Sequence, residues 1–138
     1  MREILFRGKR LQSNNEEWGT PNQQWTTSDI WEYGYYSKLS DSKFERLNHQ
    51  IGTYRVNPAT VGQYTGLNDK HGNRIFEGDI VILNGSKAQY AVFWKNGDYQ
   101  CGFCVAENGV DYPLANYLTA EYTVVGNIHD NDFKEDKQ

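Results

Sequence analysis

Three Asn-Gly dipeptides divide the C-terminal half of this chain, and they restrict its fold more than any other feature of the sequence. They are Asn84-Gly85, Asn96-Gly97 and Asn108-Gly109. Asn-Gly is the strongest short-range signal for a tight β-hairpin, because both residues accept the positive φ angles of the turn. The segments around these dipeptides are rich in Val, Ile, Tyr and Phe, which is typical of strands. We therefore expect consecutive antiparallel strands between residues 78 and 128.

Short strands joined by tight turns predict a mostly β fold. Such a meander usually curls into a small barrel, because closure hides the strand edges. The prediction is a partly open, SH3-like barrel from about residue 60 to 128, closed by a strand that begins at Tyr122 and ends near Ile128. We expect residues 1–59 to form an N-terminal β-rich lobe, and residues 60–138 to form the barrel-like part with a short flexible tail. A length of 138 residues suits one domain, so both parts are expected to form one compact unit.

The start of the N-terminal lobe gives weaker signals. Residues 4–7 alternate in the manner of a strand, which Gly8 is expected to end. Residues 12–30 are polar and have little periodicity. We therefore expect an irregular segment there, with Trp18 and Trp25 packed on the body of the domain.

The next part of the lobe is aromatic and then ambiguous. A strand is predicted from Ile30 to Leu39 because of its aromatic content. Residues 40–52 fit two structures equally well, a short helix and an irregular hairpin. Ser42 followed by Glu45 matches a helical capping box, and a helical face is formed by Phe44, Leu47 and Ile51. The flanking segments are strands, which supports the hairpin, so neither structure is preferred over the other.

Charge and hydropathy argue against several classes of protein. The formal net charge of −4 provides no overall attraction to nucleic acid or to anionic lipid. The longest aliphatic run, Ile80–Leu83, is far shorter than the roughly 20 residues of a membrane span. Residues 1–7 lack the apolar region of a signal peptide. The expected location is the cytoplasm, where Cys101 and Cys104 would be reduced.

Several motifs of the chain occur together in a known family. The central ones are Val61–Leu67, Asp69–Asn73 and Ile75–Val81, and they are flanked by Arg2–Arg7 and Val124–His129. Together they resemble the YopX family of phage and prophage proteins over nearly the whole chain. The resemblance implies a β-rich, phage-encoded protein of the bacterial host cell with no established activity. It brings no catalytic residues to this sequence.

A few features look like metal or catalytic sites, but structural roles explain them better. Cys101 and Cys104 have no second ligand pair for zinc, and their spacing along a strand directs the thiols to opposite faces. Asp69–Asn73 lacks the glycine position of a calcium loop and predicts a plain hairpin turn. Glu77 and Asp79 are expected to be solvated turn residues. We expect no metal, no cofactor and no catalytic residue, since the histidines lie in separate segments, at His49, His71 and His129.

The N-terminus carries the one basic cluster of the sequence. Arg7, Lys9 and Arg10 could contact phosphate groups, with Trp18 or Trp25 as a stacking surface. The alternative is a solvated basic rim at a strand end. The acidic balance of the whole chain favours that alternative.

Aromatic residues are more numerous than one small core is expected to hide. The candidates for a surface role are Trp31, Tyr33, Tyr35, Tyr36, Trp94 and Tyr99. Protein interfaces are enriched in Tyr and Trp, so these residues are candidates for a contact surface. Packing in the core and around it is the alternative.

The function that best fits these observations is a non-enzymatic accessory protein of phage or prophage that self-associates. A host or phage protein is a further possible partner. The alternative function is a nucleic-acid-binding β-barrel module, which rests on analogy between folds. An enzyme is not expected, because no motif places a nucleophile, a base and an acid together.

Overall fold

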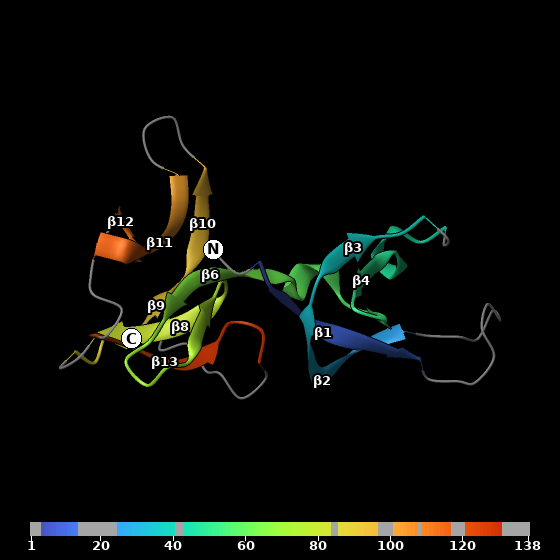
Figure 1. The fold of residues 1–138 in the computed structure, drawn as a ribbon, viewed down its shortest axis with the longest axis horizontal. Coiled ribbons are helices and arrows are strands. Elements are labelled where there is room, and N and C mark those ends of the chain that lie inside the picture. Colours follow the sequence, from blue (N-terminus) through green and yellow to red (C-terminus); the bar gives the residue numbers. More distant parts are fainter. Residues whose placement is uncertain are drawn as a thin grey trace. The chain divides into compact units, whose positions relative to one another are not determined.

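Figure 1 shows the fold as a computed structural model, which describes residues 4–13, 25–40, 43–83, 86–96, 101–107, 109–116 and 121–130. Regular structure in these ranges consists of strands and three short 3₁₀ turns, so the prediction of a mostly β fold is confirmed. Within the same ranges, no helix is long and apolar enough to cross a membrane. The described residues group into two compact units, Ile4–Gln63 and the residues from Tyr64 onward. That the two act as one compact unit stays a prediction.

The strands of the N-terminal unit belong to two antiparallel sheets, one with the order β2-β1-β6-β7 and one with the order β3-β4-β5. In one sheet β1 lies between β2 and β6, and in the other β4 lies between β3 and β5. A bulge between Lys9 and Leu11 interrupts the register of β1 on β2. The elements are β1 Phe6–Ser13, β2 Trp25–Gly34, β3 Tyr36–Lys38, η1 Glu45–Leu47, β4 His49–Ile51, β5 Tyr54–Arg55, η2 Pro58–Thr60 and β6 Gly62–Asn68.

Gly8 does not end the first strand, contrary to the prediction. β1 continues through Gly8 as far as Ser13. A Cβ atom at position 8 would lie 3.2 Å from side-chain atoms of Ile51, Val56 and Val61. Glycine is needed here because these aliphatic side chains approach the backbone of β1 closely. Its role is therefore packing within a strand, not a turn.

The prediction of an irregular segment at residues 12–30 is wrong at both of its described ends. Β-structure extends to Ser13, and β2 begins at Trp25, which is the partner of Ser13 in the ladder. The side chains of β2 near this end are mostly polar and exposed. Backbone pairing with β1 forms the strand without the apolar alternation that sequence analysis relies on. Trp18 lies outside the described residues.

The aromatic strand predicted at Ile30–Leu39 is divided at Tyr35 into β2 and β3. After it the chain forms an irregular hairpin, one of the two predicted alternatives, in which β3 pairs with β4. The 3₁₀ turn η1 occupies only three residues of the connection. Pairing with β3 and β5 outweighs the weak helical periodicity, because a helix this short has little stability of its own. Ser42 of the capping box lies outside the described residues.

The C-terminal unit contains the remaining strands and two three-stranded sheets, with orders β13-β8-β9 and β10-β11-β12. β6 continues into this unit and pairs with β7. Three of the predicted antiparallel connections are confirmed by the pairing of β8 with β9, β10 with β11 and β11 with β12. The elements are β7 Arg74–Phe76, β8 Asp79–Leu83, β9 Tyr90–Ala91, β10 Phe93–Asn96, β11 Cys101–Glu107, β12 Val110–Pro113, η3 Leu114–Asn116 and β13 Tyr122–Asn127.

The Asn-Gly dipeptides that predict these hairpins are only partly described. Gly109, between β11 and β12, has a φ of +80° as the turn requires. The other positions that bear on the turns, Asn84, Gly85, Gly97 and Asn108, lie outside the described residues. The predicted hairpins are therefore confirmed by the pairing of the strands on either side of each dipeptide.

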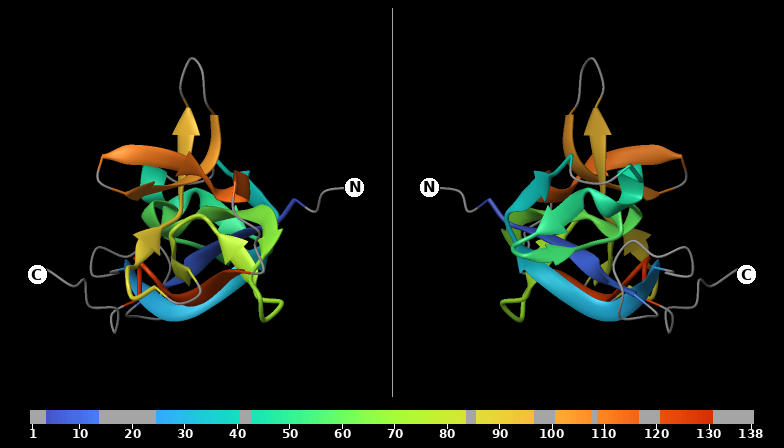
Figure 2. Two further views of the ribbon diagram at one scale, coloured as in Figure 1. Left: turned by 90° about the vertical axis from the view of Figure 1, so that its left-hand side faces the viewer. Right: turned by 90° about the vertical axis from the view of Figure 1, so that its right-hand side faces the viewer.

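One apolar core joins the sheets of the C-terminal unit. The chain leaves β9 at Ala91, passes the buried Val92 and enters β10, so that it crosses from one three-stranded sheet to the other (Figure 2). β13 pairs with β8, as the predicted closing strand should. Sheets that share one core in this way form the partly open barrel that the sequence predicts. The core side chains are Ile75, Val81, Val92, Val105, Leu114 and Tyr122.

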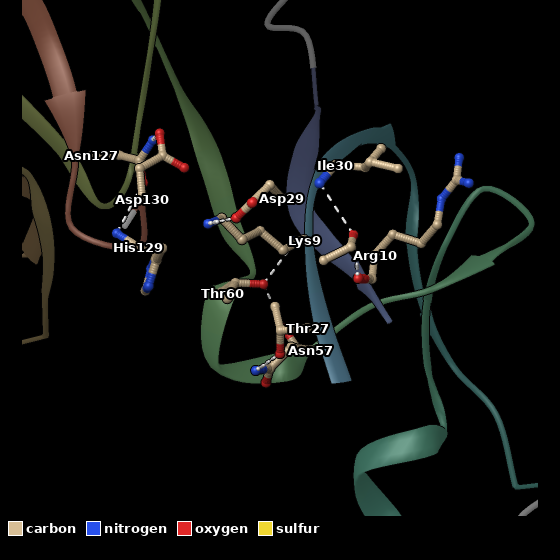
Figure 3. A network of polar contacts seen from close by, with 11 residues as sticks. Lys9, Arg10, Thr27, Asp29, Ile30, Asn57, Thr60, Asn127, His129 and Asp130 are labelled. Carbon is tan, nitrogen blue, oxygen red and sulfur yellow. Dashed lines mark hydrogen bonds and ion pairs between the residues drawn. The ribbon is translucent and has the colours of Figure 1, made fainter. Parts of the chain in front are cut away.

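Local hydrogen bonds stabilise the end of the closing strand. The Asn127 amide donates to the Asp130 carboxylate at 2.6 Å, and its oxygen accepts from the His129 N–H at 2.9 Å (Figure 3). The Ile128 N–H donates to the carbonyl of Gly78 at 2.9 Å. The strand end is thus attached to the turn that precedes β8.

Candidate functional site

The turn between β6 and β7 is held by one buried carboxylate. Asp69 Oδ1 accepts hydrogen bonds from the N–H groups of His71 and Asn73, at 2.9 and 2.8 Å. Its Oδ2 accepts from the N–H of Val124 in β13 at 3.0 Å. Gly72 completes the turn with a φ of +84°. The prediction of a hairpin turn at Asp69–Asn73 is confirmed, and the turn is attached to the closing strand.

The charge of Asp69 is stabilised by these contacts. Burial raises the pKa of its carboxyl group, but the hydrogen bonds from Val124, Asn73 and His71 lower the pKa by more. The net pKa lies below the ordinary value of the group. All these donors belong to the fold itself, so the arrangement is structural.

Asp79 is fully buried, so the prediction that it is solvated is wrong. Its Oδ2 accepts from the N–H of Phe76 at 2.7 Å, which closes the tight turn between β7 and β8. Its carbonyl accepts from the N–H of Val92 at 2.9 Å. Gly78 in the same turn has a φ of +91°. The acidic residues Asp69 and Asp79 of the motif therefore serve the fold.

Two of the predicted phosphate-contact residues are buried against an aromatic ring. Arg7 and Lys9 lie on one face of β1, and both cations lie over the ring of Trp31, at 4.7 and 5.5 Å from its centroid. The Lys9 ammonium lies 3.7 Å from the Asp29 carboxylate, and its side chain is only 3% exposed. Cations that stack on a ring and are removed from solvent are poorly placed to receive a phosphate from a partner.

Arg10, the third predicted phosphate contact, is half-buried. Its Nε donates to Glu32 at 2.6 Å, and its guanidinium lies 3.7 Å from the ring centroid of Tyr54. The structure thus brings all three cations into contacts with β2 or β5. None of these placements suggests an exposed basic surface.

A polar network fixes the middle of β1. The Lys9 N–H donates to Thr60 Oγ1 at 2.8 Å, and the Asn57 N–H donates to the Lys9 carbonyl at 2.9 Å (Figure 3). Asn57 also donates through its side chain to Thr27 Oγ1 of β2 at 2.8 Å. These bonds connect β1, β2 and the η2 turn, so the strand pair has little freedom to move apart.

The predicted aromatic interface residues divide into two groups. Trp31 and Tyr36 are half-buried and contact neighbouring side chains, whereas Tyr33 and Tyr35 are 55% and 79% exposed. Trp94 in the C-terminal unit is also exposed, and its ring packs edge-on against Phe103 at 4.9 Å. Tyr99 lies outside the described residues. The exposed members of the N-terminal unit gather at the end of β2.

β2 is the outer strand of its sheet. It pairs with β1 along one edge, and within the described part of the chain no strand pairs with its other edge. The strand is ten residues long and ends in the exposed aromatic segment. A long outer strand can pair with a strand from another chain. The edge of β2 and the side chains of Tyr33 and Tyr35 therefore form the candidate interface.

The sequence analysis missed a group of polar side chains around His49. The Tyr36 hydroxyl is hydrogen-bonded to His49 Nδ1, and His49 Nε2 lies 3.1 Å from the Glu45 carboxylate. Lys38 forms an ion pair with the same carboxylate at 2.7 Å. Glu45 and His49 are four residues apart, but only the strand pairing brings Tyr36 to them. No local signal could have revealed this group.

Within the described part of the chain, the motif Cys101–Cys104 does not form a metal site. Cys104 is buried, and its Sγ contacts the carbonyl of Gly102 at 3.6 Å. The side chain of Cys101 lies outside the described part. Among the residues that the structure describes, no three His, Cys, Asp or Glu side chains are grouped so that they could hold a metal ion.

Comparisons with known proteins agree with the motifs in the sequence. The family model described as YopX protein matches residues 9–133 of the chain. No curated protein matches the chain. A solved structure, described as protein EF1440 from Enterococcus faecalis, is similar in fold with a TM-score of 0.50 and 22% sequence identity. The match covers 95% of this chain and 96% of that one.

Proposed function

The chain belongs to the YopX family, and on that premise we propose that it is a non-enzymatic interaction module that self-associates through the outer edge of β2. We further propose that it is an accessory protein of a phage or prophage and that it acts in the cytoplasm of the bacterial host. The observation that carries it is the combination of an outer strand with exposed aromatic side chains at its end.

The backbone of β2 can supply the pairing. An outer strand offers N–H and C=O groups to an added strand, which gives affinity without a preformed pocket. Two copies of one strand pair antiparallel across a twofold axis, and this arrangement produces the isologous interface that is commonest among soluble oligomers. The ten residues of β2 are enough for such a ladder.

The aromatic residues can supply the buried area. Tyr33 lies on β2 itself and Tyr35 follows directly after it, and both rings are largely exposed. Tyrosine is enriched at interfaces because a rigid ring buries a large area and its hydroxyl still finds a hydrogen-bond partner. A second copy placed against the edge would cover both rings.

Sedimentation equilibrium at micromolar concentrations tests the proposal. The natural chain should show a species larger than the monomer, whereas a Tyr33→Lys, Tyr35→Lys variant should be monomeric, because two charges would be desolvated at the interface. Val110→Lys is the matched control, since Val110 is an exposed apolar residue on β12 of the C-terminal unit. This control should associate as the natural chain does. A natural chain that is monomeric over the whole range would disprove self-association.

The alternative, a nucleic-acid-binding module, has less support. Arg7 and Lys9 are buried and Arg10 contacts Glu32, so the chain is expected to bind DNA weakly and only at low salt. Binding can be measured by fluorescence anisotropy with labelled single- and double-stranded DNA. Tight binding at physiological salt that is lost in an Arg10→Ala variant would favour the alternative over self-association alone.

A further inference from the structure

A bulge divides the outer strand β2 into two parts. The ladder with β1 passes from Trp31 directly to Thr27, so three residues of β2 lie opposite Arg10 alone. The hydroxyl of Ser28 donates to the carbonyl of Arg10 at 2.7 Å and accepts from the N–H of Ile30 at 3.1 Å. A side chain therefore takes the place of the backbone pairing that a regular strand would make at this point.

Asp29 adds a charge to this bulge. Its side chain is 81% exposed, and its carboxylate lies 3.7 Å from the Lys9 ammonium. A strand added to β2 at this point would have to remove part of the water around the carboxylate, which costs free energy. Bulges and charged side chains are two devices by which natural proteins protect outer strands from unwanted pairing. Both devices occur together in the middle of β2.

The other outer strands show that the bulge follows a pattern of the whole fold. Among the strands that the structure describes, β3, β5, β7, β9, β10 and β12 are also outer strands, and each has four residues or fewer. The two longer outer strands are β2 and β13, and both contain a register shift, which in β13 lies between Val124 and Gly126. No described outer strand therefore offers more than four residues of unbroken register.

In β2 the regular register lies on the C-terminal side of the bulge. Trp31–Gly34 pairs with four consecutive residues of β1. This segment contains the exposed ring of Tyr33 and ends beside the exposed Tyr35. The other regular part, Trp25–Thr27, is shorter, and its exposed residues are threonines. Regular pairing that also covers the two tyrosines is therefore limited to the last four residues of the strand.

We propose that the Ser28–Ile30 bulge limits strand addition on β2 to Trp31–Gly34 and thereby keeps the association weak and in one register. Each backbone hydrogen bond of a ladder adds a modest amount to affinity, so a ladder of four residues binds less tightly than one along the whole strand. A partner strand that slipped toward residue 25 would meet the bulge, which specifies the register. The inference deepens the proposed function and rests on it for the surface concerned.

Deletion of Asp29 and Ile30 tests the proposal, because it leaves Ser28 alone opposite Arg10 and makes the register of β2 continuous. Circular dichroism first establishes that the variant folds. In sedimentation equilibrium its dissociation constant should be at least about tenfold lower than that of the natural chain, since the longer ladder adds several backbone hydrogen bonds. Asp29→Asn is the matched control, which removes the charge and keeps the bulge. Its dissociation constant should stay within about threefold of the natural value.

Ser28→Ala provides a second arm that keeps the length of the chain. The N–H of Ile30 loses the acceptor that Ser28 provides, so its hydrogen exchange in dilute protein should accelerate at least about tenfold. The same N–H becomes available to an added strand, so the dissociation constant should fall at least about twofold. Thr26→Ala, at an exposed residue of the same strand, should change neither quantity. Unchanged exchange or unchanged association in Ser28→Ala would overturn the proposal, even where the deletion variant does not fold.

The outcomes separate this proposal from self-association itself. A natural chain that is monomeric, together with a deletion variant that associates, would refute self-association and support the limiting role of the bulge. A natural chain that associates as tightly as the deletion variant would refute that role and support self-association. Tyr33→Lys, Tyr35→Lys placed in the deletion variant locates the contact, because it should weaken the association only where β2 forms the interface.

Discussion

The carboxylate of Asp69 and the N–H of Val124, 55 positions later in the chain, are joined by a hydrogen bond of 3.0 Å. The same carboxylate organises its own turn through the N–H groups of His71 and Asn73. One side chain therefore shapes the β6–β7 hairpin and attaches it to the strand that closes the barrel. Near it, the N–H of Lys70 donates to the carbonyl of Tyr122 at 3.0 Å. Asp69 and Val124 both belong to the motifs that resemble the YopX family, and here they connect distant strands.

Asp69→Asn should destabilise the protein by about 1–3 kcal/mol, because the new amide group would face N–H donors in place of a carboxylate oxygen. Urea unfolding followed by circular dichroism gives the free energy of unfolding. Glu121→Gln, at an exposed acidic residue, is the matched control and should change that energy by less than about 0.5 kcal/mol. Equal effects in both variants would show that Asp69 has no special role.

The contribution of Asp69 should depend on pH. Its pKa in the folded state is lower than the ordinary value of about 4, so the carboxylate stabilises the fold fully above that value. The stabilisation is lost as the pH falls through the folded-state pKa, since both states are then protonated. The difference in unfolding free energy between the natural chain and Asp69→Asn should therefore narrow below about pH 4. A difference that stays constant from pH 7 to about pH 2.5 would contradict this assignment.

Gly8→Ala should cost about 1–3 kcal/mol, because the added Cβ would lie 3.2 Å from Ile51, Val56 and Val61. Gly72→Ala is the comparison. At Gly72 a Cβ meets no atom within 4 Å, and the cost of about 1–2 kcal/mol arises from the φ of +84° instead. Thermal unfolding measures both effects.

Ile51→Val distinguishes steric crowding at Gly8 from the backbone strain at Gly72. It removes the Cδ1 atom that the new Cβ of residue 8 would meet. In the double variant Gly8→Ala, Ile51→Val, the loss of stability should be smaller than the sum of the single losses. In Gly72→Ala, Ile51→Val, the losses should add. Additive losses in both pairs would mean that crowding at Gly8 is not the source of its cost.

Removal of the closing strand should unfold the protein. A chain that ends at Ala120 lacks β13, which contains the fully buried Tyr122 and pairs with β8. The exposed area would cost ~25 cal/mol per Å² of apolar surface, and the edge of β8 would be left open. A chain that ends at Asp130 keeps β13 and should melt within a few degrees of the natural one. A cooperative transition near the natural temperature in the shorter chain would refute the role of β13 as the closing strand.

Much of the fold could be predicted from local signals. Short apolar segments such as Ile80–Leu83 and Tyr122–Val125 are strands that pair as expected. The turn at Asp69–Asn73 forms where glycine and side-chain oxygens favour it. These features depend on φ preferences and on alternation over a few residues, which the sequence contains directly. The polar strand at Trp25–Ile30 was missed because its pairing with β1, and not its own composition, makes it a strand.

The sequence by itself determined where the C-terminal strands and turns lie, that they form a partly open barrel, and which family the chain resembles. The tertiary structure alone decided the roles of Gly8, Asp79 and His49. Gly8 is a packing residue because Ile51 and Val56 lie against it, and His49 is part of a polar chain because β3 brings Tyr36 beside it. Asp79 is buried in the turn before β8, where it accepts hydrogen bonds from the N–H groups of Phe76 and Val92. Each role depends on neighbours that only folding brings together, and no local pattern records them.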